Sequence, residues 1–312
     1  MLLSICIPTY NRGEYLRQTL QSIVSQDAWD DGKSVEITIS DNCSTDDTPA
    51  IAAEFQQQYG AAIRYVHLKQ AVDPHDNFAS ALDLGQGKFL KLQNDTCLWQ
   101  PGALGKFLDI AERFADADLI LTPNSGGSDS AVRCGSMDET LAASSFYLTW
   151  IGTFAISREC WRKIDDPMRY RDLRLPQVDL VVRVMSSGGT AAVCPYRFFQ
   201  VQEIGHRVNY QVAEVFCKNY FSILVPHISP EVLALEKKRL LNDYLIRRHF
   251  DFFKEYNCMP QKGYWQNTRI YHRDIWFYTS FIKVAVWYLI SRFFNHEQLR
   301  RLKGIIQRKK MS

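Results

Sequence analysis

The sequence lacks the short motifs that usually mark a phosphate-binding loop. Neither the Gly-x-Gly-x-x-Gly fingerprint nor the Gly-x-x-x-x-Gly-Lys-Ser/Thr loop follows its first apolar run. Its eight cysteines include no Cys-x-x-Cys pair, which argues against a zinc site and against a disulfide scaffold. The first residues also lack the charged segment and cleavage site of a signal peptide, so we expect a cytoplasmic protein with reduced cysteines.

An excess of charge of one sign is missing everywhere except at the carboxyl end. The 312 residues carry a net charge of only +3, yet nine Lys or Arg residues face two acidic residues from Tyr271 onward. The rest of the chain is therefore mildly acidic. Because the basic charge is confined to a tail that is otherwise apolar, we expect an anionic partner for that tail and no binding of nucleic acid.

Strand-like and helical patterns alternate through the first part of the chain. This order is typical of an α/β fold with a mostly parallel, Rossmann-like sheet and helices on both faces. The predicted strands are Leu2–Ile7, Val35–Ser40, Ile63–Leu68, Phe89–Gln93 and Leu119–Thr122. The predicted helices between them are Arg12–Gln26, Pro49–Gln58, His75–Leu84 and Gly102–Phe114.

The second half of the chain is less regular. Residues 123–139 are polar and are predicted to form a loop. Further predicted elements are a strand at Trp150–Ser157, a helix at Arg158–Ile164, a helix over Leu180–Met185 and a strand at Thr190–Cys194. The pattern then becomes helical, so we expect one α/β domain over 1–205, a helical extension over 206–270 and a basic amphipathic tail over 271–312.

Polar side chains follow the first two predicted strands at the point where each strand ends. Thr9 to Arg12 follow the first strand, and Asp41 ends the second. Ligands of open α/β sheets bind outside the carboxyl ends of the strands. Tyr10 offers a ring for stacking, and Asp41 can accept a hydrogen bond from a base or a ribose. Each residue alone could be a helix cap or a turn, but their matching positions favour a nucleotide site.

Two longer motifs make the pattern more specific. The run Ile-Ser-Asp-Asn-x-Ser-Thr-Asp-Asp-Thr covers residues 39–48, and a Gly-x-Phe…Asp…Pro-Gly-Ala-Leu block covers 87–104. Over residues 2–200 the sequence resembles the inverting family 2 glycosyltransferases of GT-A fold, in particular those of bacterial O-antigen or capsule synthesis. The resemblance implies transfer of a sugar from a nucleotide-diphosphate sugar to a hydroxyl of a saccharide acceptor that is expected to be lipid-linked.

The resemblance also implies roles for individual residues. Asn94-Asp95-Thr96 stands where the family has an Asp-x-Asp or Asp-Asp-Asp cluster, so Asp95 is the expected ligand of Mn²⁺ or Mg²⁺, although it is the only acid there. His206 is a candidate second metal ligand, with a purely structural role as the alternative. The expected nucleotide-sugar contacts are Pro8, Thr9, Tyr10, Asn11, Arg12, Asp41, Asn42, Asp73, Asn77 and Asn94.

The catalytic base and the acceptor site are expected further along the chain. Leu175 to Arg183 resembles the family segment Glu-Asp-x-x-Leu-x-x-Arg, with Asp179 at the position of the base. Trp150 and Gly152 fall where the family lines its acceptor site. A helix-capping role for Asp179, and for Asp73 and Asn77, and a core role for Trp150 are the alternatives.

The tail suggests where the protein works. The nearly apolar segment Asp274–Phe294 and the basic segment Arg300–Lys310 fit a helix lying in an anionic membrane surface. The expected location is therefore cytoplasmic and peripheral, at the inner face of the cell membrane. Packing on the catalytic domain, a homodimer interface and a spanning helix are alternatives.

Two other functions are compatible with parts of the pattern. The missing acids at Asn94 and Thr96 allow a degenerate, non-enzymatic protein that binds nucleotide or partners in a polysaccharide assembly complex. A sugar nucleotidyltransferase would need a glycine-rich basic loop after the first strand, and Pro8 to Asn11 does not provide one.

Overall fold

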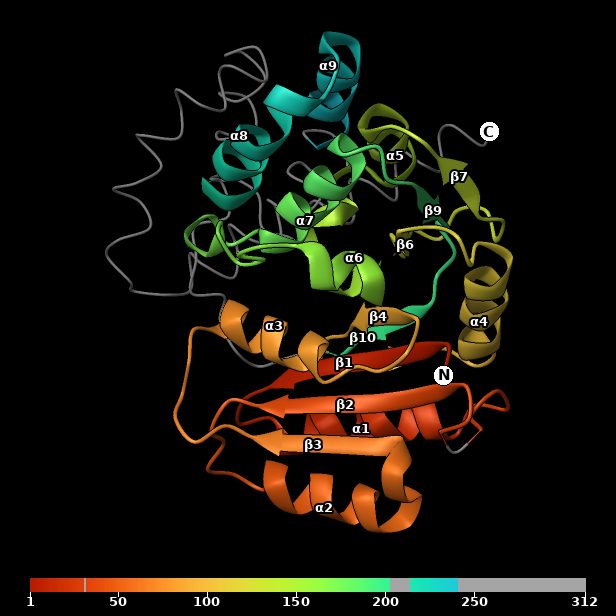
Figure 1. Ribbon diagram of the computed structural model, residues 1–312, viewed down its shortest axis with the longest axis vertical. Coiled ribbons are helices and arrows are strands. Elements are labelled where there is room, and N and C mark those ends of the chain that lie inside the picture. The colour runs from red at the N-terminus through yellow and green to blue at the C-terminus, as the bar shows by residue number, and fades with distance from the viewer. Residues whose placement is uncertain (31, 203–213, 241–312) are drawn as a thin grey trace, which may run out of the picture. The chain divides into compact units, whose positions relative to one another are not determined.

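The computed structural model describes residues 1–30, 32–202 and 214–240 (Figure 1). The chain divides into two compact units, Met1–Asn209 with Ser222–Ile228, and Tyr210–Phe221 with Ser229–Ser312. Each unit is described by itself. His206 and the tail from residue 271 lie outside the described residues, so their predicted roles stay predictions.

An eight-stranded sheet forms the centre of the first unit, in the order β3-β2-β1-β4-β8-β6-β9-β7. β1 lies parallel to β2 and β4, and β2 lies parallel to β3, whereas β8 is antiparallel to both β4 and β6. The predicted mostly parallel sheet is thus confirmed. The strands are β1 Leu3–Thr9, β2 Val35–Asp41, β3 Ile63–His67, β4 Phe89–Leu92, β6 Leu119–Leu121, β7 Val132–Cys134, β8 Phe154–Ser157 and β9 Ala191–Val193. A separate antiparallel pair is formed by β5 Cys97–Trp99 and β10 Phe199–Val201.

Helices cover both faces of this sheet, with α3 in front of the strands and α1 behind them in Figure 1. The α-helices are α1 Gly13–Val24, α2 Thr48–Tyr59, α3 Pro74–Asp83, α4 Ala103–Arg113, α5 Met137–Ser144, α6 Arg158–Lys163, α7 Pro176–Ser186, α8 Tyr220–Leu224 and α9 Pro230–Arg239. Short 3-10 turns occupy Gly60–Ala62, Ser145–Thr149, Ile151–Thr153, Arg171–Leu173 and Val225–His227, and Glu214–Asn219 is a π-helical turn.

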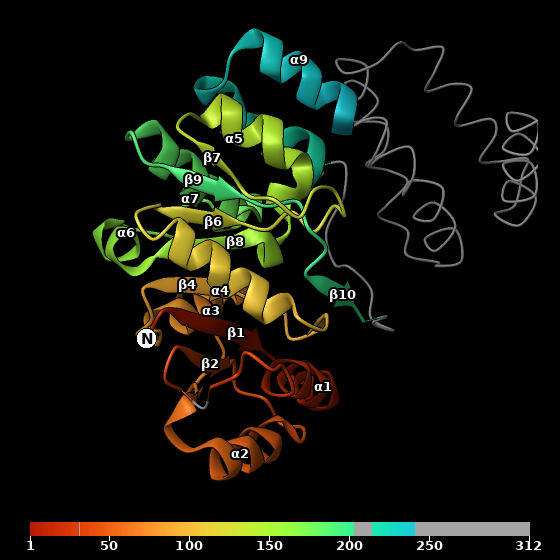
Figure 2. The same cartoon turned by 90° about the vertical axis from the view of Figure 1, so that its right-hand side faces the viewer.

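The core explains why the central strands are apolar runs. Every residue of β1, β2 and β4 is buried, because each of these strands has a neighbour on both sides and helices above and below. Apolar side chains of α1, α2 and α4 pack on one face of them in a single cluster. The edge-on view of Figure 2 shows these layers.

Two sequence predictions of local structure were wrong. The predicted loop at 123–139 contains β7 and the start of α5, where the Ser136 hydroxyl caps the helix by accepting the Glu139 amide. The predicted strand at Trp150–Ser157 begins only at Phe154, because the chain first makes a 3-10 turn through Ile151–Thr153.

The second unit is described over part of its length. Within it, the Tyr220 hydroxyl donates to the Glu236 carboxylate at 2.9 Å, and both residues are buried. Burial raises the pKa of Tyr220 well above its ordinary value, so the phenol stays protonated as the donor. Over the described part of the chain, no helix is both long and apolar enough to cross a membrane.

Candidate nucleotide-sugar site

The carboxyl ends of β1, β2 and β4 meet at one edge of the sheet. Thr9, the last residue of β1, lies directly beside Asp41, the last residue of β2, in the parallel register. β4 ends at Leu92, and the turn that follows it carries Asp95. Residues up to 86 positions apart in the chain therefore come into contact at this edge, as the hydrogen bond from Thr9 to Asp95 shows.

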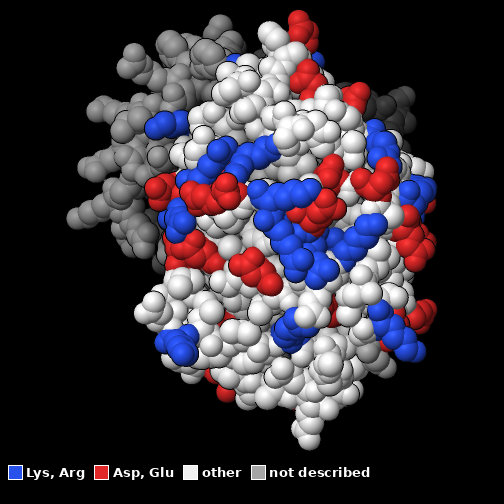
Figure 3. Space-filling model, in the orientation of Figure 1, with Lys and Arg blue, Asp and Glu red and all other residues white. Residues whose placement is uncertain are grey.

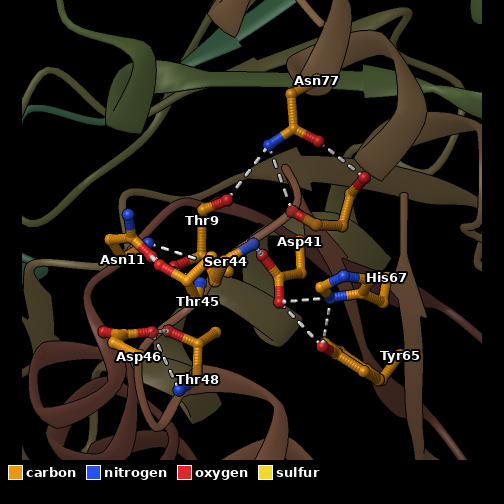
Figure 4. Close-up of polar contacts among 11 residues, drawn as sticks. Thr9, Asn11, Asp41, Ser44, Thr45, Asp46, Thr48, Tyr65, His67 and Asn77 are labelled. Atoms are coloured by element: carbon orange, nitrogen blue, oxygen red, sulfur yellow. Dashed lines mark hydrogen bonds and ion pairs between the residues drawn. The ribbon is translucent and has the colours of Figure 1, made fainter. Parts of the chain in front are cut away.

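Asp41 is fully buried and holds the ends of β2 and β3 together (Figure 4). Its Oδ1 accepts the Ser44 amide at 2.9 Å, and its Oδ2 accepts the Tyr65 hydroxyl at 2.7 Å. His67 Nδ1 lies 3.1 Å from the same Oδ2. Burial, and next the Asp41 carboxylate, raise the pKa of Tyr65, so the phenol stays protonated and donates. Neither Tyr65 nor His67 was predicted as a site residue, although both lie within the predicted strand Ile63–Leu68.

Asn11 joins the loop after β1 to the loop after β2 (Figure 4). Its backbone is left-handed, with φ of 50°, a conformation that asparagine tolerates better than most residues. Its backbone N–H donates to Ser44 Oγ at 2.8 Å, and its side-chain Oδ1 accepts the Thr45 backbone N–H at 2.8 Å. Asn11 therefore shapes the two loops, while the neighbouring Tyr10 is 53% exposed.

Asp95 is buried between the first strand and the first helix. Its Oδ2 accepts the Thr9 hydroxyl at 2.9 Å, and its Oδ1 accepts Arg12 Nη1 at 2.9 Å. The Thr19 hydroxyl donates to its backbone carbonyl at 2.9 Å. Burial raises the pKa of the Asp95 carboxyl above its ordinary value, although the Arg12 charge and hydrogen bond oppose this. The structure thus brings Thr9, Arg12 and Asp95 together at this edge of the sheet.

The side chains of three other predicted contact residues form hydrogen bonds to the protein itself, within the loops and the helix beside the site. The Asn42 side chain exchanges two hydrogen bonds with the backbone of Val72. Asn77 donates to the Ser40 carbonyl at 3.1 Å and accepts the Ser40 hydroxyl at 2.7 Å. Asp73 caps α3 by accepting the His75 amide at 2.8 Å.

The residues that could hold a divalent metal are few. Across the described residues, no cluster of three or more His, Cys, Asp or Glu side chains is arranged to bind a metal ion. Beside Asp95, however, Asn94 Oδ1 is buried and has no hydrogen-bond partner within the described structure. An unpartnered amide oxygen next to a buried carboxylate fits the oxygen ligands of Mg²⁺ or Mn²⁺, with the remaining ligands left to substrate and water.

Asp179 lies in the first turn of α7 and is 1% exposed. Arg169 binds it with two hydrogen bonds, from Nε to Oδ2 at 2.9 Å and from Nη2 to Oδ1 at 2.6 Å. Arg183, one helical turn further on, approaches Oδ2 at 3.8 Å. The predicted base is therefore a buried, ion-paired carboxylate in this structure. Sequence reasoning missed Arg169 because it lies in the loop before α7 and has no fixed helical spacing to Asp179.

The predicted acceptor residues lie in the turn just before β8. The Trp150 ring packs edge-on against Phe199 with 5.6 Å between ring centroids. Gly152 lies under the same indole, where a Cβ atom would come within 2.5 Å of the ring. Only glycine fits there, so Gly152 allows the close approach of this turn to Trp150.

A buried lysine links this acceptor segment to β4. Lys91 is fully buried, and its Nζ donates to the carbonyl oxygens of Leu92 and Gly152. The same Nζ lies 4.9 Å from the centre of the Phe199 ring. Desolvation by burial lowers the pKa of Lys91 to about 7. The signal in the sequence was a single lysine within the apolar run Phe89–Leu92.

The mostly parallel sheet with helices on both faces is an α/β fold of the GT-A type. Residues 4–162, about half of the chain, match the family described as Glycosyl transferase family 2. The chain belongs to this family, which confirms the resemblance seen in its sequence.

Named relatives share part of the chain. Abequosyltransferase RfbV of Salmonella typhimurium is 39% identical over 89 residues, which are 28% of this chain and 26% of the relative. A GalNAc(5)-diNAcBac-PP-undecaprenol beta-1,3-glucosyltransferase of Campylobacter jejuni is 29% identical over 109 residues, covering 35% of this chain and 34% of that protein. The similarity thus spans about a quarter to a third of these relatives.

Solved structures share the fold. The S. aureus TarS 1-349 structure in complex with UDP has a TM-score of 0.55 at 16% identity, over 80% of this chain and 75% of that one. The mannosyltransferase PcManGT from Pyrobaculum calidifontis, in complex with GDP-Man and Mn²⁺, has a TM-score of 0.53 at 14% identity, over 88% of this chain and 84% of that one.

Proposed function

We propose that this protein is an inverting glycosyltransferase of cell-surface polysaccharide biosynthesis. It would transfer a sugar from a nucleotide-diphosphate sugar to a hydroxyl of a lipid-linked saccharide. The observation that carries the proposal is the meeting of Thr9, Arg12, Asp41 and Asp95 at the carboxyl edge of the sheet of a family 2 chain. The names of the Salmonella and Campylobacter relatives support the class of reaction and the kind of acceptor.

The donor would bind along the ends of β1, β2 and β4. Tyr10 is exposed and can stack on the base, while the buried Asp41 keeps the neighbouring loops in place and offers its remaining acceptor capacity to base or ribose. Arg12 is partly exposed, with 37% of its side-chain surface accessible. Its guanidinium can therefore turn from Asp95 to the donor diphosphate, a geometry that suits arginine.

Asp95 and the carbonyl oxygen of Asn94 would hold a divalent cation, Mn²⁺ or Mg²⁺, with His206 as a proposed further ligand. Such an ion would neutralise charge on the departing nucleoside diphosphate. This chain contributes only one acid to that position among its described residues, so the diphosphate oxygens and water would complete the coordination. Thr9 orients the Asp95 carboxylate by its hydrogen bond to Oδ2.

Asp179 would act as the base that takes the proton of the acceptor hydroxyl while that hydroxyl attacks the anomeric carbon. Trp150 and Gly152 would line the acceptor side, and Gln177 helps to place them. Gln177 Nε2 donates to the Thr149 carbonyl at 2.7 Å and thereby connects α7 to the acceptor segment. The enzyme would work in the cytoplasm, at the inner face of the membrane that carries its lipid-linked acceptor.

One observation favours a second function. Asp95 already has Arg12 and Thr9 as partners, and both acids that would flank it in the family motif are replaced. A degenerate family member that binds a nucleotide or a partner without turnover would retain such a site, in which the Asp95 charge is already neutralised by Arg12.

Thermal stabilisation by nucleoside diphosphates tests the proposal. A ligand that binds only the folded state at about 100 times its Kd stabilises that state by about 2.7 kcal/mol. We expect one nucleoside diphosphate to raise the melting temperature, with a larger shift when Mn²⁺ or Mg²⁺ is present. Asp95→Asn should remove the metal-dependent part, whereas Asp109→Asn on the exposed side of α4 should not.

Three outcomes separate the alternatives. A shift that grows with metal supports the donor site built around Asp95. An equal shift with and without metal would show that Asn94-Asp95-Thr96 holds no metal. No shift with any nucleoside diphosphate would favour the non-enzymatic alternative.

A further inference from the structure

A loop with three arginines, Arg169, Arg171 and Arg174, lies between α6 and α7, and we call residues 165–174 the arginine loop. Arg169 holds both carboxylate oxygens of Asp179, at 2.9 and 2.6 Å. Arg171 Nη1 donates to Asp76 Oδ2, in the first turn of α3, at 2.6 Å. The loop therefore connects α7, which carries the proposed base, to α3, which lies beside the proposed donor site.

The loop is anchored at its centre and exposes its arginines. Met168 is 3% exposed and fixes the loop to the core, whereas the side chains of Arg169 and Arg171 are each 40% exposed. Asp166 and Arg174 bracket it with left-handed backbones, φ of 41° and 61°. For residues other than glycine this conformation costs energy and often accompanies functional segments. Figure 3 shows Lys and Arg side chains gathered over α6 and this loop.

The described arrangement conflicts with the chemistry proposed for Asp179. A general base must present a carboxylate oxygen to the hydroxyl that it deprotonates. In this structure Asp179 is 1% exposed and both of its oxygens are taken up by one guanidinium. Transfer of Arg169 to another anion would uncover the Asp179 carboxylate, and an anion that arrives with the acceptor would couple this release to the transfer.

Phosphate is the anion that suits the two side chains. Arginine binds phosphate with paired, charge-assisted hydrogen bonds, as it binds carboxylate. Arg169 and Arg171 are two residues apart and both reach solvent, so one phosphate group can bridge them. When Arg169 moves to the phosphate, the buried Asp179 carboxylate would still have the positive charge of Arg183 at 3.8 Å.

We propose that Arg169 and Arg171 form a binding site for a phosphate or diphosphate group of the acceptor, and that occupation of this site draws Arg169 away from Asp179. The inference rests on the proposed role of Asp179 as base. It defines the acceptor class: because Arg169 contacts the base directly, the phosphate lies on the sugar that is glycosylated or on the next one. The donor diphosphate is assigned separately, to Arg12 and Asp95.

Slow hydrolysis of the donor, in which water replaces the acceptor, tests the inference. The full chain is assayed with the sugar nucleotide whose nucleoside diphosphate gives the largest thermal shift. Inorganic phosphate, or a polyprenyl diphosphate in detergent, is added as the probe. We expect either probe to raise hydrolysis by the wild type severalfold. If the polyprenyl diphosphate acts at the lower half-maximal concentration, the phosphate of the acceptor belongs to its lipid carrier. If inorganic phosphate acts at the lower concentration, the phosphate belongs to a sugar phosphate.

Variants separate release of the base from simple support of the fold. Arg169→Ala should raise hydrolysis without any probe and should no longer respond to phosphate. Arg171→Ala should need about tenfold more phosphate, the loss expected for one charge-assisted contact. Arg169→Lys keeps the cation and should fall between wild type and Arg169→Ala. Arg162→Ala, an exposed arginine of α6, should respond to phosphate as the wild type does.

The outcomes that overturn the inference are distinct from failure of the proposed function. If the donor is hydrolysed but neither probe changes the rate, the arginines do not form an acceptor phosphate site. If Arg169→Ala and Arg169→Lys both lose hydrolysis and melt at lower temperature, the pair with Asp179 is structural. If no variant binds or hydrolyses any sugar nucleotide, the proposed function itself fails and the inference fails with it.

Discussion

Each carboxylate of the proposed site has little freedom at the scale of the single residue. Asp41, Asp95 and Asp179 are all at least nine-tenths buried, and each accepts two or more hydrogen bonds from neighbours distant in sequence or on another element. Buried charges of this kind are stable only when they are paired and hydrogen-bonded. Their partners therefore decide which carboxylate can act as a ligand, which as a scaffold and which as a base.

Asp179→Asn tests the base. The amide cannot accept the proton of the acceptor hydroxyl, so kcat should fall by about 100-fold or more. The melting-temperature shift caused by the nucleoside diphosphate should stay as in the wild type, because the donor contacts lie on other elements. Asp172→Asn, an exposed residue of the arginine loop, is the control. A rate near that of the wild type would show that another group takes the proton.

Lys91→Met tests the effect of burying an amine in the sheet. Lys91 has a pKa of about 7 in the folded state, well below its ordinary value. Between these two pKa values the unfolded chain binds more protons, so the free energy of unfolding rises with pH. From about pH 7 to about pH 9, the free energy of unfolding of the wild type relative to Lys91→Met should rise by up to about 1.4 kcal/mol per pH unit.

Urea unfolding of both proteins at several pH values measures this difference. Parallel pH profiles would mean that Lys91 stays charged in the fold, stabilised by the carbonyl oxygens of Leu92 and Gly152.

Sequence could identify the acids at the strand ends but not the partners that control them. Asp41 and Asp95 were predicted because each follows an apolar run at a fixed place. Tyr65, Lys91 and Arg169 were not predicted, because each acts through a neighbour that only the folded chain supplies. The same limit applies to Asn11 and Asn77, which were predicted as ligand contacts and whose side chains are engaged with loop and strand backbone.

At the scale of elements, α3 shows how a helix terminus can look like a binding motif. Asp73 precedes the helix, accepts the His75 amide at 2.8 Å and also contacts the His75 ring at 2.9 Å. Asp76 in the same turn pairs with Arg171. These contacts account for the acidic character of the segment without a nucleotide.

Asp73→Ala should therefore weaken the fold more than the binding of donor. Loss of an N-cap costs about 1 kcal/mol, so the melting temperature should fall measurably. The shift produced by the nucleoside diphosphate should remain as in the wild type. If the shift were lost while the melting temperature stayed unchanged, Asp73 would be a donor contact as its sequence position predicted.

Elements with a strong local signal could be predicted, whereas those made by distant pairing could not. β1, β2 and α1 were predicted to within a few residues, because an apolar run or a periodic face extends over a whole element. The three-residue strands β5 and β10 were missed. They form because Asn124 exchanges two hydrogen bonds with the Phe199 backbone and because the aromatic rings of Trp99 and Phe199 pack together.

At the scale of the whole molecule, the sequence separates a mildly acidic body from a basic tail. Anionic lipid attracts each nearby basic residue by about 1 kcal/mol, and salt screens the attraction. The full chain should therefore sediment with vesicles that contain anionic lipid, and less so at high salt. Changing Arg308, Lys309 and Lys310 to Glu should weaken this binding by about tenfold or more.

The matched control changes the same number of charges on the body. Lys33, Lys69 and Lys88 are exposed, and their replacement by Glu should leave vesicle binding nearly as it is in the wild type. Equal losses in both triple variants would indicate attraction by overall charge, and the tail would then have no special role.

The reversed direction of β8 has a consequence for how such chains diverge. Because β8 is antiparallel to β4, the turn with Trp150 and Gly152 enters the sheet beside the end of β4. The proposed donor contacts lie in the chain up to Asp95, and the proposed acceptor residues begin at Trp150. The two groups thus meet where β4 pairs with β8. We expect this arrangement to let donor specificity and acceptor specificity evolve separately. A chimera of two family members joined after β4, assayed with the donors and acceptors of both parents, should combine the donor of one with the acceptor of the other.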